Sequence, residues 1–167
     1  MSQEDPGFES NHDHQHCIVQ ALETARALCR ERRQRLTPIR ELVLKLVWHN
    51  HQPLGAYDLL PALANAGFNS APPTVYRALE FLQEQGFVHR IASLNAYVGC
   101  PHPDRPHRSG FLICRGCRRA VELNTGMVHT ALKSSADELG FEIEQEMVEV
   151  VGLCPDCRAT GGAHAQS

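Results

Sequence analysis

Residues 72–99 of the chain have the sequence PPTVYRALEFLQEQGFVHRIASLNAYVG. Two prolines open this stretch and Gly86 interrupts it. A helix is expected between them, because proline suits the first helical turn and glycine suits the position after the last. Two short runs rich in β-forming residues follow, 87–92 and 96–99, with residues 93–95 as the turn between them. The stretch therefore predicts a helix followed by a two-stranded hairpin.

The segment before residue 72 predicts three more helices. Apolar residues recur at helical spacing over 17–34, Thr37 and Pro38 supply a cap and a first-turn proline for a second helix, and a third helix covers 56–66. Pro61 lies inside the third helix and deletes a backbone donor, so we expect that helix to start late or to bend in its first turn. Helices followed by such a hairpin predict a winged helix-turn-helix, whose recognition helix begins at residue 72 and enters the major groove of DNA.

The pattern changes beyond a proline-rich loop at 101–110. Residues 111–114 and 118–123 predict a hairpin, 127–139 a helix and 141–153 a long strand. The fold class is therefore α+β, with an N-terminal winged helix-turn-helix domain and a C-terminal α/β domain. The expected ranges are 1–16 for a flexible tail, 17–99 for the winged-helix domain, 100–110 for a hinge loop, 111–158 for the C-terminal domain and 159–167 for a disordered tail.

Charge is distributed unevenly along the chain, although the net charge is only -3. Residues 26–45 contain seven Lys or Arg and two Glu, whereas residues 122–149 contain seven Asp or Glu and one Lys. A basic front half suggests that this end of the protein meets phosphates.

Neither a transmembrane segment nor a secretory signal is expected. No apolar run approaches 18 residues, and the N-terminus is acidic and histidine-bearing. We therefore expect a cytoplasmic protein with no membrane partner, in which the seven cysteines are reduced and serve metal binding or catalysis rather than disulfides.

Four of these cysteines form two C-x-x-C pairs. Cys114 and Cys117 make the first pair, and Cys154 and Cys157 make the second. Zinc prefers four tetrahedral ligands, and a two-residue gap lets both sulfurs of a pair reach one ion. The alternative is a redox dithiol, but such a site needs only one pair. An enzyme is not expected, because four cysteines leave zinc no open position and no set of nucleophile and base stands out.

A second group of residues offers a different set of ligands. It consists of His89 on the first strand of the hairpin, Cys100 after the second, His107 in the loop and Glu122 after the first cysteine pair. We call these four residues the mixed cluster. One sulfur, two nitrogens and one carboxylate fit zinc, and a thiolate disfavours manganese or iron(II). His102 is a rival for His107 in this set.

Several other residues carry weaker signals. A lone loop histidine is usually solvated, and Cys100 alone would be read as a small buried hydrophobe. Histidine tracts can bind metal, but a solvated tail is the better reading of the N-terminal histidines. These are His12, His14 and His16.

Five stretches together resemble the ferric uptake regulator family, and within it the zinc uptake regulator branch. They are RLTPIR (35–40), AYDLL (56–60), PPTVYRALEFLQEQGFVHR (72–90), FLICRGCRRAVEL (111–123) and GLCPDC (152–157). The resemblance covers about residues 17–157 and implies a homodimer formed by the C-terminal domain. The iron-sensing members typically have a dense cluster of histidine and aspartate before the first cysteine pair, and the segment HPDRPHRSG here is sparser.

The resemblance also implies roles for individual residues. The mixed cluster would bind a regulatory zinc, which gives two zinc ions per chain, and Tyr57, Tyr76 and Arg77 would contact a pseudo-palindromic operator. Thr74 lies on the same outer side of the recognition helix. Arg77 has an alternative role in an ion pair with Glu80 or Glu84, and Tyr76 has one in packing at the helix edge.

The function implied is a zinc-dependent repressor of zinc-uptake genes. Two alternatives stay open at this point. One is a regulator of the same fold that senses iron, manganese or peroxide, and the other is a zinc-stapled module that binds other proteins.

Overall fold

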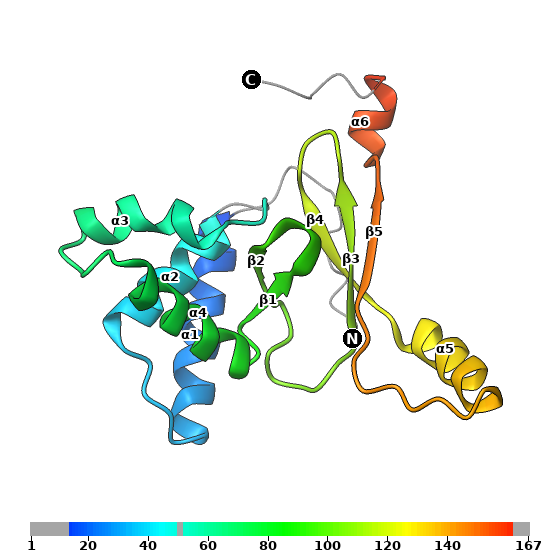
Figure 1. The fold of residues 1–167 in the computed structure, drawn as a ribbon. Coiled ribbons are helices and arrows are strands. Elements are labelled where there is room, and N and C mark those ends of the chain that lie inside the picture. Colours follow the sequence, from blue (N-terminus) through cyan, green and yellow to red (C-terminus); the bar gives the residue numbers. More distant parts are fainter. Residues whose placement is uncertain (1–13, 50–51, 162–167) are drawn as a thin grey trace.

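The computed structural model describes residues 14–49 and 52–161. The expected tails at 1–13, with His12, and at 162–167 lie outside the described residues. Two parts lie side by side, a helical part that ends in a hairpin and a part built on a three-stranded sheet (Figure 1). We call the hairpin the wing. Among the described helices, none combines the length and the apolar composition that crossing a bilayer requires.

The helical part contains four α-helices and a short 3-10 helix before the wing. Its elements are α1 (His14–Glu31), α2 (Pro38–His49), η1 (Ala56–Leu59), α3 (Leu60–Asn65), α4 (Pro72–Glu84), β1 (Val88–Ile91), η2 (Ala92–Leu94) and β2 (Ala96–Gly99). β1 and β2 pair in antiparallel fashion, from Val88 opposite Gly99 to Ile91 opposite Ala96. The predicted helix and hairpin over residues 72–99 are thus confirmed.

One apolar core holds these helices together. Val43 and Val47 of α2 are buried in the same core cluster as Leu63 of α3 and Val75 and Leu79 of α4. Such apolar residues recur three or four positions apart, which places them on one face of each helix. The opposite face of α4 is left exposed.

Prolines set the starts of two helices. Pro61 lies in the first turn of α3, after η1, so the expected late start is confirmed. Pro38 is the first residue of α2, and the Thr37 carbonyl accepts a hydrogen bond from the Glu41 amide at 3.0 Å. The Thr37 hydroxyl is buried without a hydrogen-bond partner, so its expected capping role is wrong.

The first helix differs from expectation at both ends. It begins at His14 and ends at Glu31, whereas helix was expected over 17–34 and residues 14–16 were placed in the tail. Once the turn around buried Ile18 has formed, each added helical residue gains a hydrogen bond at little cost, and nothing from His14 to His16 breaks a helix. Arg33 takes a positive φ of 54°, which ends the helix before residue 34.

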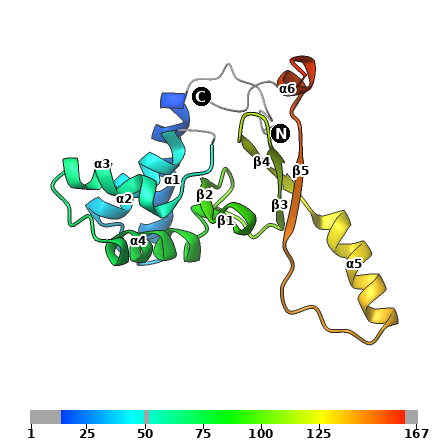
Figure 2. The same cartoon turned by 45° about the horizontal axis from the view of Figure 1, so that its top comes forward.

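The second part contains a three-stranded sheet and two helices. These are β3 (Ser109–Cys114), β4 (Ala120–Asn124), α5 (Gly126–Glu138), β5 (Val148–Gly152) and α6 (Pro155–Ala159). The strand order is β4-β3-β5, with β3 antiparallel to β4 and parallel to β5. In Figure 2, α6 continues from one end of β5, and α5 projects beyond the opposite end of the sheet.

Three boundaries in this part differ from expectation. Residues 141–147 were expected to belong to a long strand, but β5 covers only Val148–Gly152. Its partner β3 begins at Ser109, and the pairing starts with Gly110 opposite Val148, so residues 141–147 pair with no strand among the described residues. β3 starts two residues inside the expected hinge loop, and α6 includes Ala159 of the expected tail.

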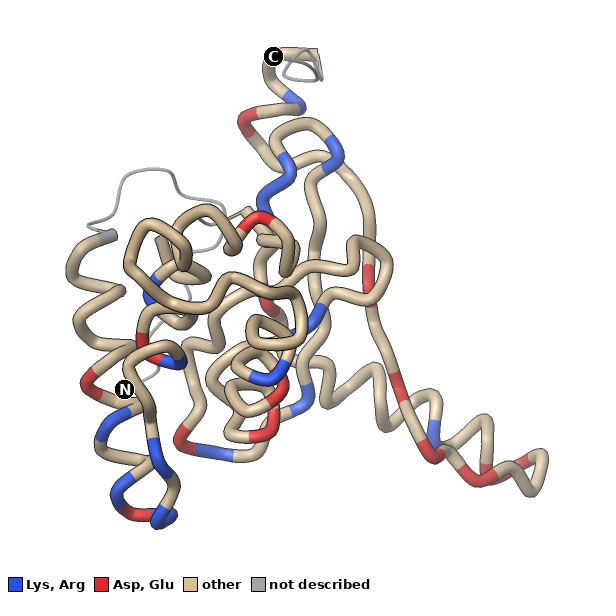
Figure 3. The backbone as a smooth tube through the Cα atoms, turned by 60° about the vertical axis from the view of Figure 1, so that its left-hand side comes forward, with Lys and Arg blue, Asp and Glu red and all other residues tan. Residues whose placement is uncertain are grey.

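Charged residues are distributed unevenly over the molecule. Figure 3 shows that Lys and Arg gather where α1 leads into α2, and that Asp and Glu lie along the arm formed by α5 and residues 139–147. This arrangement agrees with the charge asymmetry of the sequence.

The wing packs against the sheet through a small apolar cluster. Ile91 of β1 is fully buried against Phe111 and Ile113 of β3. A further contact fixes the wing to the helical part, because the ring of Trp48 on α2 lies directly against Gly99 at the end of β2. The wing is thus held between the helices and the sheet.

We predict that Gly99→Ala destabilises the protein. A Cβ atom at Gly99 would lie 2.2 Å from Cε2 of Trp48, so the indole ring must move. Overpacking of this kind lowers the free energy of unfolding by about 1–3 kcal/mol. Urea unfolding followed by circular dichroism measures this loss. Gly152→Ala is the control, because nothing lies within 4 Å of a Cβ there. Equal midpoints for the two variants would contradict the prediction.

Candidate metal centres

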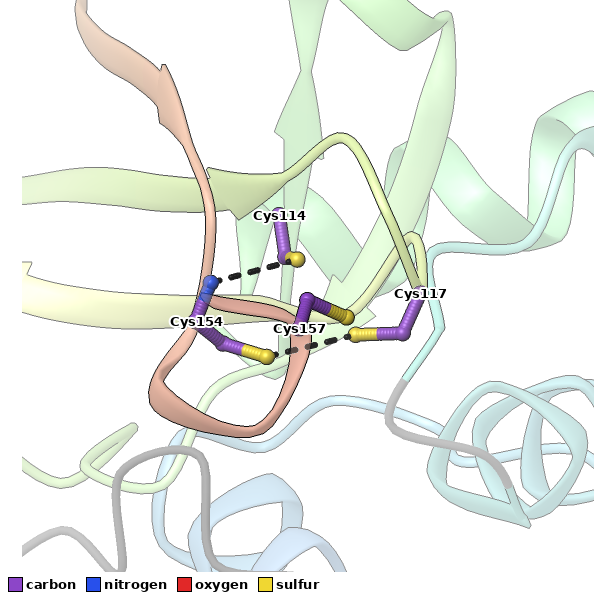
Figure 4. A group of neighbouring side chains, drawn as sticks. All are labelled: Cys114, Cys117, Cys154 and Cys157. Carbon is purple, nitrogen blue, oxygen red and sulfur yellow. Dashed lines mark hydrogen bonds between the residues drawn. The ribbon is translucent and has the colours of Figure 1, made fainter. Parts of the chain in front are cut away.

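The four cysteines of the two C-x-x-C pairs come together at one end of the sheet (Figure 4). Cys114 ends β3, Cys117 lies in the turn before β4, Cys154 follows β5 and Cys157 lies in α6. Their sulfur atoms all lie within 4.8 Å of one another, and Sγ of Cys117 is 3.8 Å from Sγ of Cys154. Four thiolates at about 2.3 Å from a tetrahedral ion would lie roughly 3.8 Å apart, so the geometry fits zinc.

The electrostatics of this four-cysteine cluster favour a bound cation. Burial opposes ionisation of Cys114, but the backbone amides of Cys154, Cys117 and Gly116 lower its pKa to about 6. Burial and the neighbouring thiols raise the pKa of Cys157 to about 12, because four sulfurs this close cannot share negative charge unaided. The Arg119 guanidinium donates to Cys117 Sγ at 3.4 Å and to Asp156 at 3.1 Å.

Gly116 is required for the close approach of the two cysteine pairs. A Cβ atom on Gly116 would lie 2.8 Å from Sγ of Cys157, so any larger residue would push the second pair away. The backbone amide of Cys154 also donates a hydrogen bond to Cys114 Sγ at 3.3 Å, which links the two pairs.

The mixed cluster forms where the wing meets the sheet. His89 comes from β1, Cys100 follows β2, His107 lies before β3 and Glu122 is on β4. One ligand atom from each of the four lies within 4.8 Å of all the others. His107 Nε2 is 2.7 Å from Glu122 Oε1 and 3.4 Å from Cys100 Sγ, and His89 Nε2 is 3.3 Å from the same carboxylate oxygen.

Hydrogen bonds within the mixed cluster do not satisfy all of its polar atoms. His89 Nε2 and the second carboxylate oxygen of Glu122 are buried without a hydrogen-bond partner. His107 Nδ1 lies 2.9 Å from the Arg105 carbonyl, and if it donates there, a neutral ring presents the lone pair of Nε2 toward the Glu122 carboxylate, which is also an acceptor. A cation between these atoms would satisfy all of them, so the residues fit a metal ion.

The ionisation of the mixed cluster also favours a bound metal ion. Burial, and then the charge of Glu122, raise the pKa of the Cys100 thiol to about 12. Burial also acts to raise the pKa of Glu122, but the two imidazoles and the Ser109 hydroxyl more than offset it, so that pKa stays below its ordinary value. Cys100 is therefore a neutral thiol here, and a bound divalent cation would favour its thiolate.

The structure brings His107, and not its rival His102, into the mixed cluster. The His102 ring lies 6.4 Å from that of His107, and both line a pocket beside the cluster. His16 lies in the first turn of α1, and neither candidate cluster includes it. Sequence reasoning missed the pair formed by His129 Nδ1 and Glu146, at 2.6 Å, which links α5 to the segment before β5. No motif marks it, because His129 is a single histidine on a helix and Glu146 is one of several acidic residues in its segment.

The residues expected to contact DNA lie on the helical part. Tyr57 in η1 is 66% exposed, and Arg77 on α4 is exposed, with no ion pair to any residue that the structure describes. Thr74 is half-buried, and Tyr76 packs at the edge of the apolar core, which supports the packing role weighed for it.

Comparisons with known proteins agree with this architecture. Residues 31–151 match the model of the "Ferric uptake regulator family". The "Zinc uptake regulation protein" of Escherichia coli K12 is 42% identical over 137 residues, which is 81% of this chain and 80% of that protein. The protein of the same name from Mycobacterium tuberculosis is 29% identical over 107 residues, 62% of this chain and 79% of that protein.

Solved structures give the same result over both parts of the chain. A zinc uptake regulator complexed with zinc and DNA has a TM-score of 0.79 and 38% identity, covering 92% of this chain and all of that one. The holo form of XcZur has a TM-score of 0.75 and 45% identity, covering 84% of this chain and 98% of that one. The α+β fold expected from the sequence is confirmed, as is the resemblance to the zinc uptake regulator branch. The chain belongs to the ferric uptake regulator family.

Proposed function

We propose that the protein is a zinc-dependent repressor that binds DNA as a homodimer, with a structural zinc in the four-cysteine cluster and a regulatory zinc in the mixed cluster. The observation that carries this proposal is the origin of the four ligands of the mixed cluster. His89 and Cys100 belong to the wing and its end, whereas Glu122 belongs to the sheet. A metal bound there would fix the DNA-binding part against the sheet. The role is regulatory and not enzymatic, in the cytoplasm, where the DNA of bacterial relatives lies.

The donor set supports zinc as the metal that is sensed. A buried thiol beside two imidazoles and one carboxylate suits zinc, whereas manganese and iron(II) sites favour harder oxygen ligands. The most similar relatives described above are named for zinc uptake, which supports the same metal and a repressor of zinc-uptake genes as the direction of control.

Two different surfaces support the homodimer and the DNA contact. β5 pairs only with β3 among the described strands, and apolar side chains are exposed on it and on the segment between α5 and β5. They include Val150, Val151, Met147, Phe141 and Leu139. An unpaired strand edge beside such a surface suits contact with a second copy of the chain. On the helical part, exposed Tyr57 and Arg77 suit contact with DNA, with Thr74 and Tyr76 beside them on α4.

The two clusters then have separate tasks. When bound, regulatory zinc supplies the attraction that holds ligands of the wing and of the sheet at one point. His89 and Cys100 fix the wing, and with it α4, relative to Glu122. Two copies of α4 then match the half-sites of a pseudo-palindrome. Raising this arrangement from one to ninety-nine per cent of molecules takes about 5.5 kcal/mol, well below the roughly 10–16 kcal/mol that zinc contributes in small zinc domains.

Cys100→Ser tests the regulatory site. The variant should stay dimeric and keep one zinc per chain, yet its DNA affinity should no longer rise with zinc. We expect zinc affinity of the mixed cluster to fall by more than the roughly 10–100-fold cost of losing a residue that only supports a ligand. The assay is a zinc titration of binding to duplexes selected from a random pool, with manganese and iron(II) in parallel. Normal zinc-dependent binding by this variant would refute the site, and a response only to iron or manganese would refute zinc sensing.

Cys114→Ser should instead damage the fold of the sheet part. The zinc site contributes on the order of 10 kcal/mol to the free energy of folding. This is comparable to the roughly 5–15 kcal/mol by which a whole domain is stable. We expect loss of the structural zinc and of the dimer, measured by metal analysis and light scattering. The control is Cys29→Ala, because Cys29 is buried in the helical core, away from both clusters. A Cys114→Ser dimer with unchanged zinc content would contradict this assignment.

Arg77→Ala should weaken DNA binding without changing zinc content. Loss of a guanidinium that contacts a base edge costs about 1–3 kcal/mol, or roughly 5–150-fold in Kd. Lys133→Ala is the matched loss of one positive charge on α5, away from the helical part, and should bind DNA normally. If both variants bind like the unmodified protein, Arg77 does not read DNA.

A further inference from the structure

One row of the sheet faces the wing. On β3, Phe111 lies opposite Glu122 of β4 and opposite Glu149 of β5. Residues directly opposed on neighbouring strands project to the same face, so these three side chains form a row. Phe111 packs against Ile91 and its ring lies 5.7 Å from that of His89, while Glu122 belongs to the mixed cluster. Glu149 completes the row but takes no part in that cluster.

Glu149 holds the turn of the wing. Its carboxylate accepts hydrogen bonds from the backbone amides of Ala92, at 2.7 Å, and Ser93, at 3.1 Å. These are the first two residues of η2, and the first amides of a helix have no acceptor within the helix. The carboxylate of a strand 57 residues further along the chain supplies that acceptor.

The ionisation of Glu149 is consistent with this contact. Burial acts to raise its pKa, but the hydrogen bonds from Ser93 and from the Ala92 amide lower it below the ordinary value. A carboxylate that accepts two backbone amides stays charged, and charge-assisted hydrogen bonds are stronger than neutral ones.

We propose that Glu149 is a positioning residue that holds the wing on the sheet and thereby sets the zinc concentration at which the mixed cluster fills. This inference rests on the proposed function, because it concerns the regulation of the same site. The mixed cluster is complete only when the wing is docked. The apparent Kd for zinc is therefore the intrinsic Kd divided by the fraction of docked molecules, and Glu149 raises that fraction.

Two variants weaken this contact, one by changing the acceptor and the other by removing a donor. Glu149→Gln removes the charge with little change of shape. Ala92→Pro removes the shorter hydrogen bond without changing any charge. Proline suits this position because Ala92 is the first residue of η2 and Ile91 before it is extended, with φ -91° and ψ 109°. Glu144→Gln, at an exposed carboxylate just before β5, is the control for loss of one negative charge.

The measurement is zinc affinity of the mixed cluster, by competition with a chromophoric chelator, together with the zinc midpoint of DNA binding. We expect each variant to weaken zinc binding, so that the Kd of the mixed cluster for zinc and the zinc midpoint of DNA binding both rise by roughly tenfold, the scale of a charge-assisted hydrogen bond. The effects of the two changes should be less than additive in the double variant, since both weaken the same contact. DNA affinity at saturating zinc should stay within about twofold of the unmodified protein, which a merely destabilised wing would not allow. Glu144→Gln should change neither value.

Three results would overturn the proposal. They are an unchanged zinc affinity in either single variant, additive effects in the double variant, or an equal shift in Glu144→Gln. The chelator competition needs no DNA, so it distinguishes failure of the role proposed for Glu149 from failure of the proposed function. If the unmodified protein binds a second zinc but its DNA binding ignores zinc, the proposed function fails while the role of Glu149 is still decided by the variants.

Discussion

The mixed cluster and the Glu149 contact both depend on the burial of Ile91 against Phe111 and Ile113. It places β1 across the sheet, so that His89, two residues earlier, reaches Glu122, and Ala92, one residue later, reaches Glu149. An apolar contact has little directional preference, whereas the carboxylates on either side of Phe111 need defined geometry. The apolar residues bring the surfaces together, and the polar ones fix how they meet.

The two metal clusters differ in where their ligands come from. All four cysteines of the first cluster belong to the sheet part, and two of them lie at the end of β3 and in the short turn that follows it. Such a site forms together with its own part of the fold. The mixed cluster draws on both parts and contains buried atoms without hydrogen-bond partners. Its geometry therefore depends on how the parts are placed, which is what a sensor of metal requires.

Much of this arrangement could be predicted from the sequence, because it rests on residues with distinctive chemistry. The two C-x-x-C pairs predicted the four-cysteine cluster, and the helix followed by a hairpin predicted the wing. The choice between His102 and His107 could not be made, since both lie in the same loop and only the path of the loop separates them. Expectation was wrong for residues 141–147, where alternating residues suggested a strand, because no described strand pairs with them.

Glu149 shows why part of such a site stays hidden in a sequence. It is one of several acidic residues between 142 and 149, and its partners are backbone amides, which every residue except proline carries. Nothing in the residue types on either side marks the contact. The pairing follows from the register of β5 on β3, which places Glu149 beside Phe111.

The order of the parts along the chain has a consequence for biosynthesis. The wing is complete at Gly99, whereas the four-cysteine cluster needs Cys157, which is translated 58 residues later. At about 5–20 residues per second, the helical part leads by roughly 3–12 s. During that interval a nascent chain carries α4 but lacks the complete four-cysteine cluster. Newly made molecules thus complete the helical part before the sheet part that contains the four-cysteine cluster.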